Sequence, residues 1–140
     1  MHANVSPENS VDNCTFDYAI IRVVPRVERE EFINVGVIVF CAEKAYLAAR
    51  VEFDRERLQA LAPQLDVQQI ADYLQTIPLI CDGGDGSGPI GQLPQRARFH
   101  WLTAPRSTLI QTSAAHCGIC CDPQDALELL MTKMVRPPLS

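Results

Sequence analysis

The fold of this chain is decided by residues 32–53, which read Phe32-Ile-Asn-Val-Gly-Val-Ile-Val-Phe-Cys-Ala-Glu-Lys-Ala-Tyr-Leu-Ala-Ala-Arg-Val-Glu-Phe53. β-Branched and aromatic residues dominate 32–41 and recur through 46–53, which favours two strands. The polar link 42–45 is short enough to join them as an antiparallel hairpin. In the first strand, strict alternation places an aliphatic row from Ile33 to Cys41 on one face, with Asn34 and Gly36 on the other. We expect that strand to be buried and central.

The neighbouring strands follow from the same pattern. In 46–53, apolar residues alternate with Tyr46, Ala48, Arg50 and Glu52, which predicts that one face of this strand contacts water. Upstream, residues 16–24 are rich in aromatic and β-branched residues and end at Pro25, which lacks a backbone donor. The sequence therefore predicts three consecutive strands.

The rest of the chain supplies helices and shorter pieces. Aspartates at 54, 66 and 122 are placed to cap helices over about 55–62, 67–76 and from Pro123 onward, the second of them ending near Pro78. The glycine-rich stretch 82–89 is predicted to be a loop, 99–102 and 108–112 short strands, and 113–121 an ordered loop.

These elements predict an α+β fold: an antiparallel sheet of four or five strands with two or three helices packed mainly on one face. A chain of 140 residues suits one domain. We assign that domain to residues 16–136, with a flexible leader over 1–15 and a short tail over 137–140.

Composition narrows the classes of function. The formal net charge is −5 and no stretch concentrates lysine or arginine, which disfavours nucleic-acid binding. No apolar run is long enough to cross a bilayer, and the N-terminal residues do not resemble a secretory signal, so we expect a cytoplasmic protein. The six cysteines are then expected to remain thiols.

The densest cluster of soft ligands is the run from His116 to Cys121. Adjacent Cys120 and Cys121 do not easily reach one tetrahedral ion together, and no second cysteine pair lies elsewhere, so we predict no metal and no cofactor. A redox pair at a helix start is the other functional interpretation. Incidental thiols are favoured over both.

The segment from Leu102 to His116 carries polar residues that an alternating strand does not explain. Arg106 is a planar anion fork, and the hydroxyls of Ser107 and Thr108 extend such recognition. Equally, serine and threonine after Pro105 suit a turn held by side chain to backbone hydrogen bonds. The sequence leaves both readings open.

Two motifs together resemble a known bacterial family, the domain of unknown function 3037. The first is Tyr18-Ala-Ile-Ile-Arg-Val-Val-Pro25 followed by Glu31-Phe-Ile-Asn-Val-Gly-Val-Ile-Val-Phe40; the second runs from Arg98 through Pro105-Arg-Ser107 and His116-Cys-Gly118 to Asp122-Pro123. The resemblance extends from about Phe16 to Val135. It implies a compact bacterial cytoplasmic protein, with members encoded beside kinase-like proteins, and hence a regulatory partner, but no established activity.

The motif positions of that family correspond here to Arg22, Asn34, Gly36, Arg106, Ser107, Gln111, His116 and Gly118. This chain departs from the pattern at Ala114-Ala115, where proline and valine are expected, and by its thiols at Cys117 and Cys121. The departures weigh against metal or thiol chemistry as a property of the whole family.

From these residues we predict one pocket that gathers Arg22, Asn34, Arg106, Ser107, Gln111 and His116. The expected function is a non-catalytic binding or regulatory module for a protein partner or a small anionic ligand. The alternative is an enzyme acting on a phosphate- or carboxylate-bearing small molecule, with His116 as acid or base and Arg106 as anion clamp.

Overall fold

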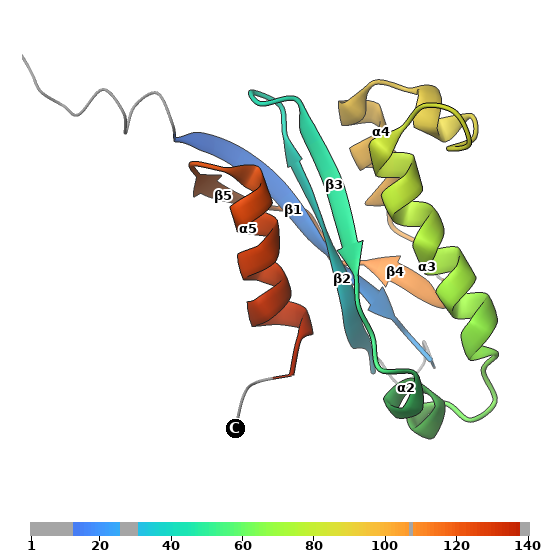
Figure 1. Ribbon diagram of the computed structural model, residues 1–140. Helices are drawn as coiled ribbons and strands as arrows, with labels where there is room; N and C mark the ends of the chain where they lie inside the picture. The colour runs from blue at the N-terminus through green and yellow to red at the C-terminus, as the bar shows by residue number, and fades with distance from the viewer. Residues whose placement is uncertain (1–12, 26–30, 107, 138–140) are drawn as a thin grey trace, which may run out of the picture.

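The structure is a computed structural model that describes residues 13–25, 31–106 and 108–137. Its strands are β1 (Cys14–Val23), β2 (Ile33–Cys41), β3 (Tyr46–Val51), β4 (Ile110–Thr112) and β5 (His116–Cys120). Its α-helices are α2 (Arg55–Leu61), α3 (Val67–Asp82), α4 (Gln95–Leu102) and α5 (Pro123–Leu130), with a 3-10 turn η2 (Ile90–Gln92) and a π-helical turn η3 (Met131–Val135). The described residues form an antiparallel sheet flanked by helices, which confirms the predicted α+β class (Figure 1).

β1 is the strand on which the sheet is built. The strand order is β3-β2-β1-β4, and β5 also pairs with β1. β2 runs along one edge of β1, whereas the other edge is divided: β4 pairs with residues 21–23 and β5 with residues 14–18. At the junction, the backbone amide of Ile20 donates to the Ser113 hydroxyl, 2.9 Å away, and the Ser113 amide donates to the Ile20 carbonyl. Two short strands therefore share one edge of β1.

A β-bulge interrupts the pairing of β1 with β2. Ile21 lies opposite Gly36 and Arg22 opposite Asn34, so Val35 is the extra residue on β2. The bulge reverses the alternation, and Val35 packs with Ile38 on the α3 side of the sheet. The predicted single aliphatic row is thus wrong: Ile33 and Val35 face one core, whereas Val37, Val39 and Cys41 face the other.

The sheet separates two hydrophobic cores. Helices α2, α3 and α4 cover the larger core through buried Leu58, Leu74 and Phe99, and α5 covers the smaller one on the opposite face through Leu127 (Figure 1). Helices therefore lie mainly on one face, as predicted. The expected solvent-facing side of β3 is wrong in part, because its Tyr46 and Ala48 pack against the core under α5.

Three local predictions are also wrong. Residues 99–102 belong to α4 instead of a strand, and the predicted loop 113–121 contains β5. Helix α3 continues past Pro78 to Asp82. Its end is held by buried Arg98, whose guanidinium donates to the carbonyls of Ile80 and Cys81 and so satisfies acceptors that a helix C-terminus leaves open.

The aspartate caps and the glycine loop agree with the sequence. Asp54, Asp66 and Asp122 each accept a backbone N–H at the start of their helices. The loop after α3 is irregular, and the Gln92 amide donates to the Gly84 carbonyl across it. No helix of the described residues is long and apolar enough to cross a membrane.

Gly36 is expected to be the least replaceable glycine of the sheet. An added Cβ would lie 2.5 Å from the Arg50 carbonyl oxygen and 3.0 Å from Ile21 Cδ1. Gly36→Ala should therefore lower the free energy of unfolding by about 2–3 kcal/mol, measured by urea denaturation. Gly84→Ala is the control: no atom lies within 4 Å of its Cβ, so only its positive φ costs about 1 kcal/mol. Equal losses in the two variants would contradict the steric explanation of Gly36.

Candidate functional site

Three of the predicted site residues form a row across the sheet. Arg22 on β1 lies opposite Asn34 on β2 at one edge and opposite Gln111 on β4 at the other. Direct cross-strand partners point to the same face of a sheet, so the three side chains share one face. The bulge determines this arrangement, because without the extra residue Asn34 would lie on the face opposite Arg22.

Two buried polar atoms of this row lack a hydrogen-bond partner among the described residues: Nε of Arg22 and Oδ1 of Asn34. The Arg22 guanidinium carbon lies 4.1 Å from the centre of the Phe32 ring, a cation–π contact. The amide of Asn34 donates to the Met134 carbonyl on η3, 2.9 Å away. The amide of Gln111 donates to the Thr108 carbonyl. Arg22 and Asn34 therefore each retain one polar atom that could form a further hydrogen bond.

Arg106 lies outside this row, in the turn that follows α4. Its guanidinium donates to the carbonyls of Trp101, Leu102 and Ala104, with the first at 2.6 Å. It also lies 4.6 Å above the Trp101 ring. Arg106 thus stabilises the turn against the end of α4. This agrees with the second interpretation of the sequence, a turn held by side chain to backbone hydrogen bonds.

A groove opens between α3 and the segment that leads into β4. Its main part has a volume of about 400 Å³ and is lined by Gln69, Ile70, Tyr73, Arg106, Thr108, Leu109 and Ile110. A smaller hollow of about 90 Å³ shares Tyr73, Arg106 and Ile110 with it and adds Trp101 and Gln111. No sequence pattern indicates this groove, because its walls are more than thirty residues apart along the chain.

His116 is separate from both the row and the groove. It begins β5 opposite Tyr18, and the two rings lie 5.4 Å apart. Tyr18 precedes Arg22 by four residues on β1, which places His116 about 13 Å along the strand from the row. Ser107 lies outside the described residues. The six predicted site residues therefore do not meet in one pocket: Arg22, Asn34 and Gln111 come together, and Arg106 lines the groove beside Gln111.

The cysteines make a cluster that the sequence did not reveal. All six are free thiols. Cys14 Sγ lies 3.2 Å from Cys41 Sγ and 3.7 Å from Cys120 Sγ, although the three residues come from three different strands. Burial raises the pKa of each of these three thiols. The exposed thiol of Cys117 instead donates to the Asp17 carboxylate, which raises its pKa.

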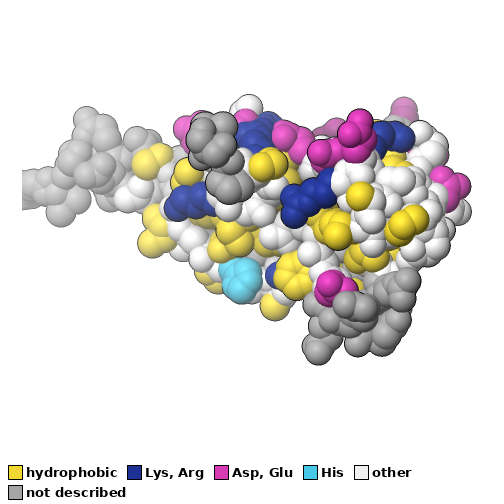
Figure 2. Space-filling model, turned by 90° about the horizontal axis from the view of Figure 1, so that it is seen from below, with side chains coloured by type: hydrophobic (Ala, Val, Ile, Leu, Met, Phe, Trp, Pro, Cys, Tyr) yellow, Lys and Arg dark blue, Asp and Glu magenta, His cyan; other side chains and the backbone are white. Residues whose placement is uncertain are grey.

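No metal centre is built from the described ranges: no group of three or more histidine, cysteine, aspartate or glutamate side chains within them is arranged to hold an ion. On the face shown in Figure 2, lysine and arginine side chains lie next to acidic ones and do not form a continuous basic surface.

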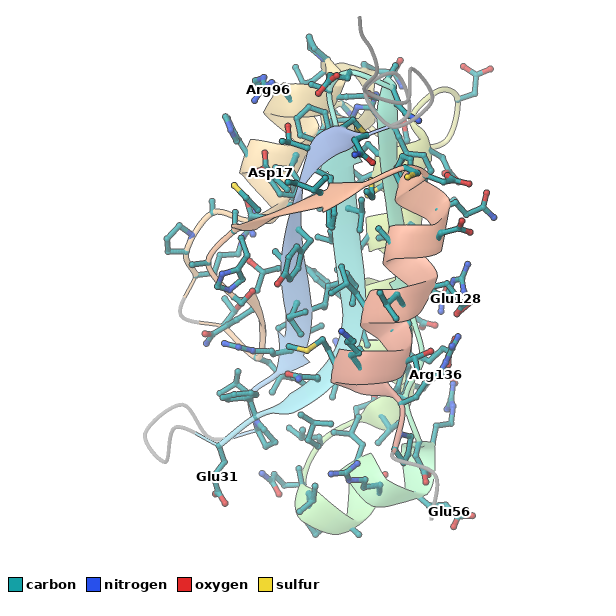
Figure 3. The ribbon with its side chains drawn as sticks, turned by 90° about the vertical axis from the view of Figure 1, so that its left-hand side faces the viewer. Asp17, Glu31, Glu56, Arg96, Glu128 and Arg136 are labelled. Carbon is teal, nitrogen blue, oxygen red and sulfur yellow. The ribbon has the colours of Figure 1, made fainter. Side chains whose placement is uncertain are left out.

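An ion network attaches the C-terminal helical segment to β3. The Arg136 guanidinium contacts Glu52 at 2.7 Å and Glu128 at 2.6 Å, and Glu128 also contacts Arg50 at 2.5 Å. Glu128 and Arg136, labelled in Figure 3, lie on α5 and just beyond η3. Hydrogen bonds from the Arg136 guanidinium lower the pKa of both carboxyl groups. Arg136 and Glu52 also line a hollow of about 260 Å³ beside Asn34.

Comparison with known proteins identifies a family. The model of the family described as "Protein of unknown function (DUF3037)" matches residues 18–135. No curated protein and no solved structure matches the chain.

The Arg136 network should make stability depend on acid pH. Because the folded pKa values of Glu52 and Glu128 lie below the ordinary 4.5, their contribution is present above that value and is lost as pH falls through the folded values. We expect the free energy of unfolding to fall as the pH drops below about 5, and Arg136→Met to flatten that fall. Urea denaturation at several pH values measures it.

Arg55→Met is the matched control, because the Arg55 guanidinium contacts the neutral amide of Gln68. It should leave the pH profile parallel to that of the unaltered protein. A profile in Arg136→Met that keeps its full slope would contradict the assignment of acid sensitivity to this network.

Proposed function

The chain belongs to the DUF3037 family of proteins of unknown function, and on that premise we propose that it is a non-catalytic binding module that holds an apolar segment of a protein partner in the groove between α3 and β4. The observation that carries the proposal is the chemistry of that groove. It is lined by three aliphatic side chains and one aromatic ring beside the uncharged Gln69 and Thr108, and Arg106, the one charged residue among its described lining residues, donates to backbone carbonyls.

The side chains of the groove are of the kinds that dominate protein interfaces. Tyr73 is 47% exposed and Trp101 is 39% exposed, on the two sides of the hollow that they share. Tyrosine, tryptophan and arginine are the residues most enriched at binding hot spots, because each offers a large contact area and a polar end. A neutral apolar segment would cover these rings without leaving an unpaired charge.

The free edge of β4 adds backbone groups to the same surface. The amide of Val24, just beyond β1, donates to the Leu109 carbonyl, and the Ser113 amide donates to the Ile20 carbonyl of β1. By antiparallel alternation, the amides of Ile110 and Thr112 then point away from β1. The Ile110 carbonyl is already bonded to the Thr108 hydroxyl. The amide groups of Thr112 therefore suit an extended partner segment that adds beside β4.

The positions of His116 and Arg106 weigh against the enzyme alternative. An acid or base must lie within hydrogen-bond reach of the group that the anion clamp holds, yet His116 belongs to β5 beside Tyr18 and Arg106 to the turn beside Trp101. A small anionic ligand would instead have to use Arg22, whose Nε has no partner within the described part of the chain. Arg106 already uses three of its five N–H donors on the carbonyls of Trp101, Leu102 and Ala104.

The test selects peptides from a random displayed library on the full chain. Enriched peptides should be rich in apolar and aromatic residues and should change the fluorescence of Trp101, which is the single tryptophan of the chain. Tyr73→Glu should weaken their binding at least tenfold, since it places a charge in the apolar groove. Isothermal titration calorimetry measures the affinity.

Leu129→Glu is the matched control, because Leu129 is also a helical residue about half exposed, at 54%, but lies on α5 across the sheet. The Leu129→Glu variant should bind the peptides with the affinity of the unaltered chain. Equal losses in both variants, or peptides that leave Trp101 fluorescence unaltered, would contradict the groove. Stabilisation by phosphorylated metabolites in a thermal-shift screen, lost in Arg22→Gln, would favour the anionic-ligand alternative.

A further inference from the structure

We propose that Cys14 and Cys120 are a site of reversible oxidation, at which a hydroperoxide converts the two thiols into a disulfide that joins β1 to β5. The two sulfur atoms lie 3.7 Å apart, and the residues are direct cross-strand partners. This site is separate from the groove, since it lies on the α5 side of the sheet.

The backbone geometry selects Cys120, and not the nearer Cys41, as the partner of Cys14. Directly opposed residues of antiparallel strands have Cα atoms about 4.5–5.5 Å apart, within the range that a disulfide spans. Asp17 lies opposite Phe40, so the β1–β2 register continued by one residue places Phe16 opposite Cys41 and Cys14 diagonally from it. Diagonal pairs are about 7–8 Å apart, which a disulfide bridges only if the backbone moves.

Exposure assigns the order of the two steps. Cys14 is 5% exposed and Cys41 is fully buried, whereas Cys120 is partly accessible at the sheet edge formed by β5. A small oxidant such as hydrogen peroxide therefore meets Cys120 first. The raised pKa of these thiols makes the reaction slower than at an activated redox centre, because the thiolate is the reactive form.

The chemistry balances with hydrogen peroxide as the oxidant. The Cys120 thiolate attacks one peroxide oxygen, the O–O bond breaks, and Cys120 sulfenic acid and one water result. The Cys14 sulfur then attacks the Cys120 sulfur, the S–O bond breaks, and the released hydroxide takes the Cys14 thiol proton and leaves as a second water. The proton that Cys120 lost completes the first water. Two thiols and one peroxide thus give one disulfide and two waters. A thiol reductant reverses the change.

The neighbouring cysteines do not compete for this bond. Cys117 and Cys121 are exposed, but the Cys117 thiol donates to Asp17 and the Cys121 thiol to Asn13. Both are an odd number of residues from Cys120, so alternation directs them to the opposite face. The consequence of the bond is mechanical: it covalently attaches β5, the strand that leads directly into α5, to the central strand of the sheet.

The test treats the purified full chain with hydrogen peroxide and maps its peptides by mass spectrometry without reduction. A Cys14–Cys120 linked peptide pair, two hydrogens lighter than the sum of its parts, is expected. The oxidised chain should also show a Tm raised by about 5 °C or more, reversed by dithiothreitol, because the crosslink closes a long loop.

Three variants separate this pair from its neighbours. Cys120→Ser should abolish the crosslink, whereas Cys41→Ser and the double variant Cys117→Ser with Cys121→Ser should form it in unchanged yield. Circular dichroism checks that each variant is folded. If a variant does not fold, the peptide map of the oxidised, unaltered chain tests the Cys14–Cys120 bond by itself. Linkage of Cys14 to Cys41, or loss of thiols to sulfinic acid without any linked pair, would overturn the proposal.

Discussion

The hydroxyl of Ser113 is the group on which the arrangement of the sheet depends. It accepts the backbone amide of Ile20 and donates to the Ala114 carbonyl, 2.9 Å away, at the point where the chain leaves β4 and turns toward β5. Ser113 is one of two buried polar residues of the described chain, at 6% exposure. A buried amide without a partner costs about 1–3 kcal/mol, so this hydroxyl lets β1 exchange one edge partner for another without that loss. Both β4 and β5 reach the central strand as a result.

The two candidate surfaces follow from that division of the edge. β4 reaches β1 beside residues 21–23, which brings Gln111 opposite Arg22 and places Ile110 among the residues that line the groove beside α3. β5 reaches β1 beside residues 14–18, which brings Cys120 opposite Cys14. On the other edge, the bulge at Val35 turns Asn34 toward Arg22. The row of Arg22, Asn34 and Gln111, the groove, and the pair of Cys14 and Cys120 thus all depend on how the other strands pair with β1.

Much of the fold could be predicted from the sequence, because the deciding signals are local. The hairpin of β2 and β3 follows from two apolar runs with a short polar link, and the caps at Asp54, Asp66 and Asp122 follow from side chains that serve their own helices. The predictions that were wrong concern segments whose structure depends on contacts with distant parts of the chain. Residues 99–102 read as a strand by composition, yet they are helical because Phe99 and buried Arg98 pack against β2 and α3. β5 lacks any period, since its pairing with β1 alone defines it.

The candidate site was predicted in part, for the same reason. The family motifs indicated Arg22, Asn34 and Gln111, and these three converge because β1 pairs with β2 on one edge and with β4 on the other. The position of Asn34 was derived from strict alternation, which a bulge of one residue inverts. Arg106 and His116 were grouped with them by chemistry, but turn geometry commits Arg106 to carbonyls and the β5 register takes His116 to Tyr18. The thiol cluster needs three strands and has no sequence signature.

Strand β1 pairs with β4 and β5 in succession on one edge and with β2, which has one extra residue, on the other. Nuclear Overhauser contacts between backbone protons measure this register directly. The account predicts a close contact between the α-protons of Ile21 and Thr112, with backbone contacts from Tyr18 to His116 and from Arg22 to Asn34. A register shifted by one residue on either edge, or an Arg22 that contacts Val35 in place of Asn34, would contradict it.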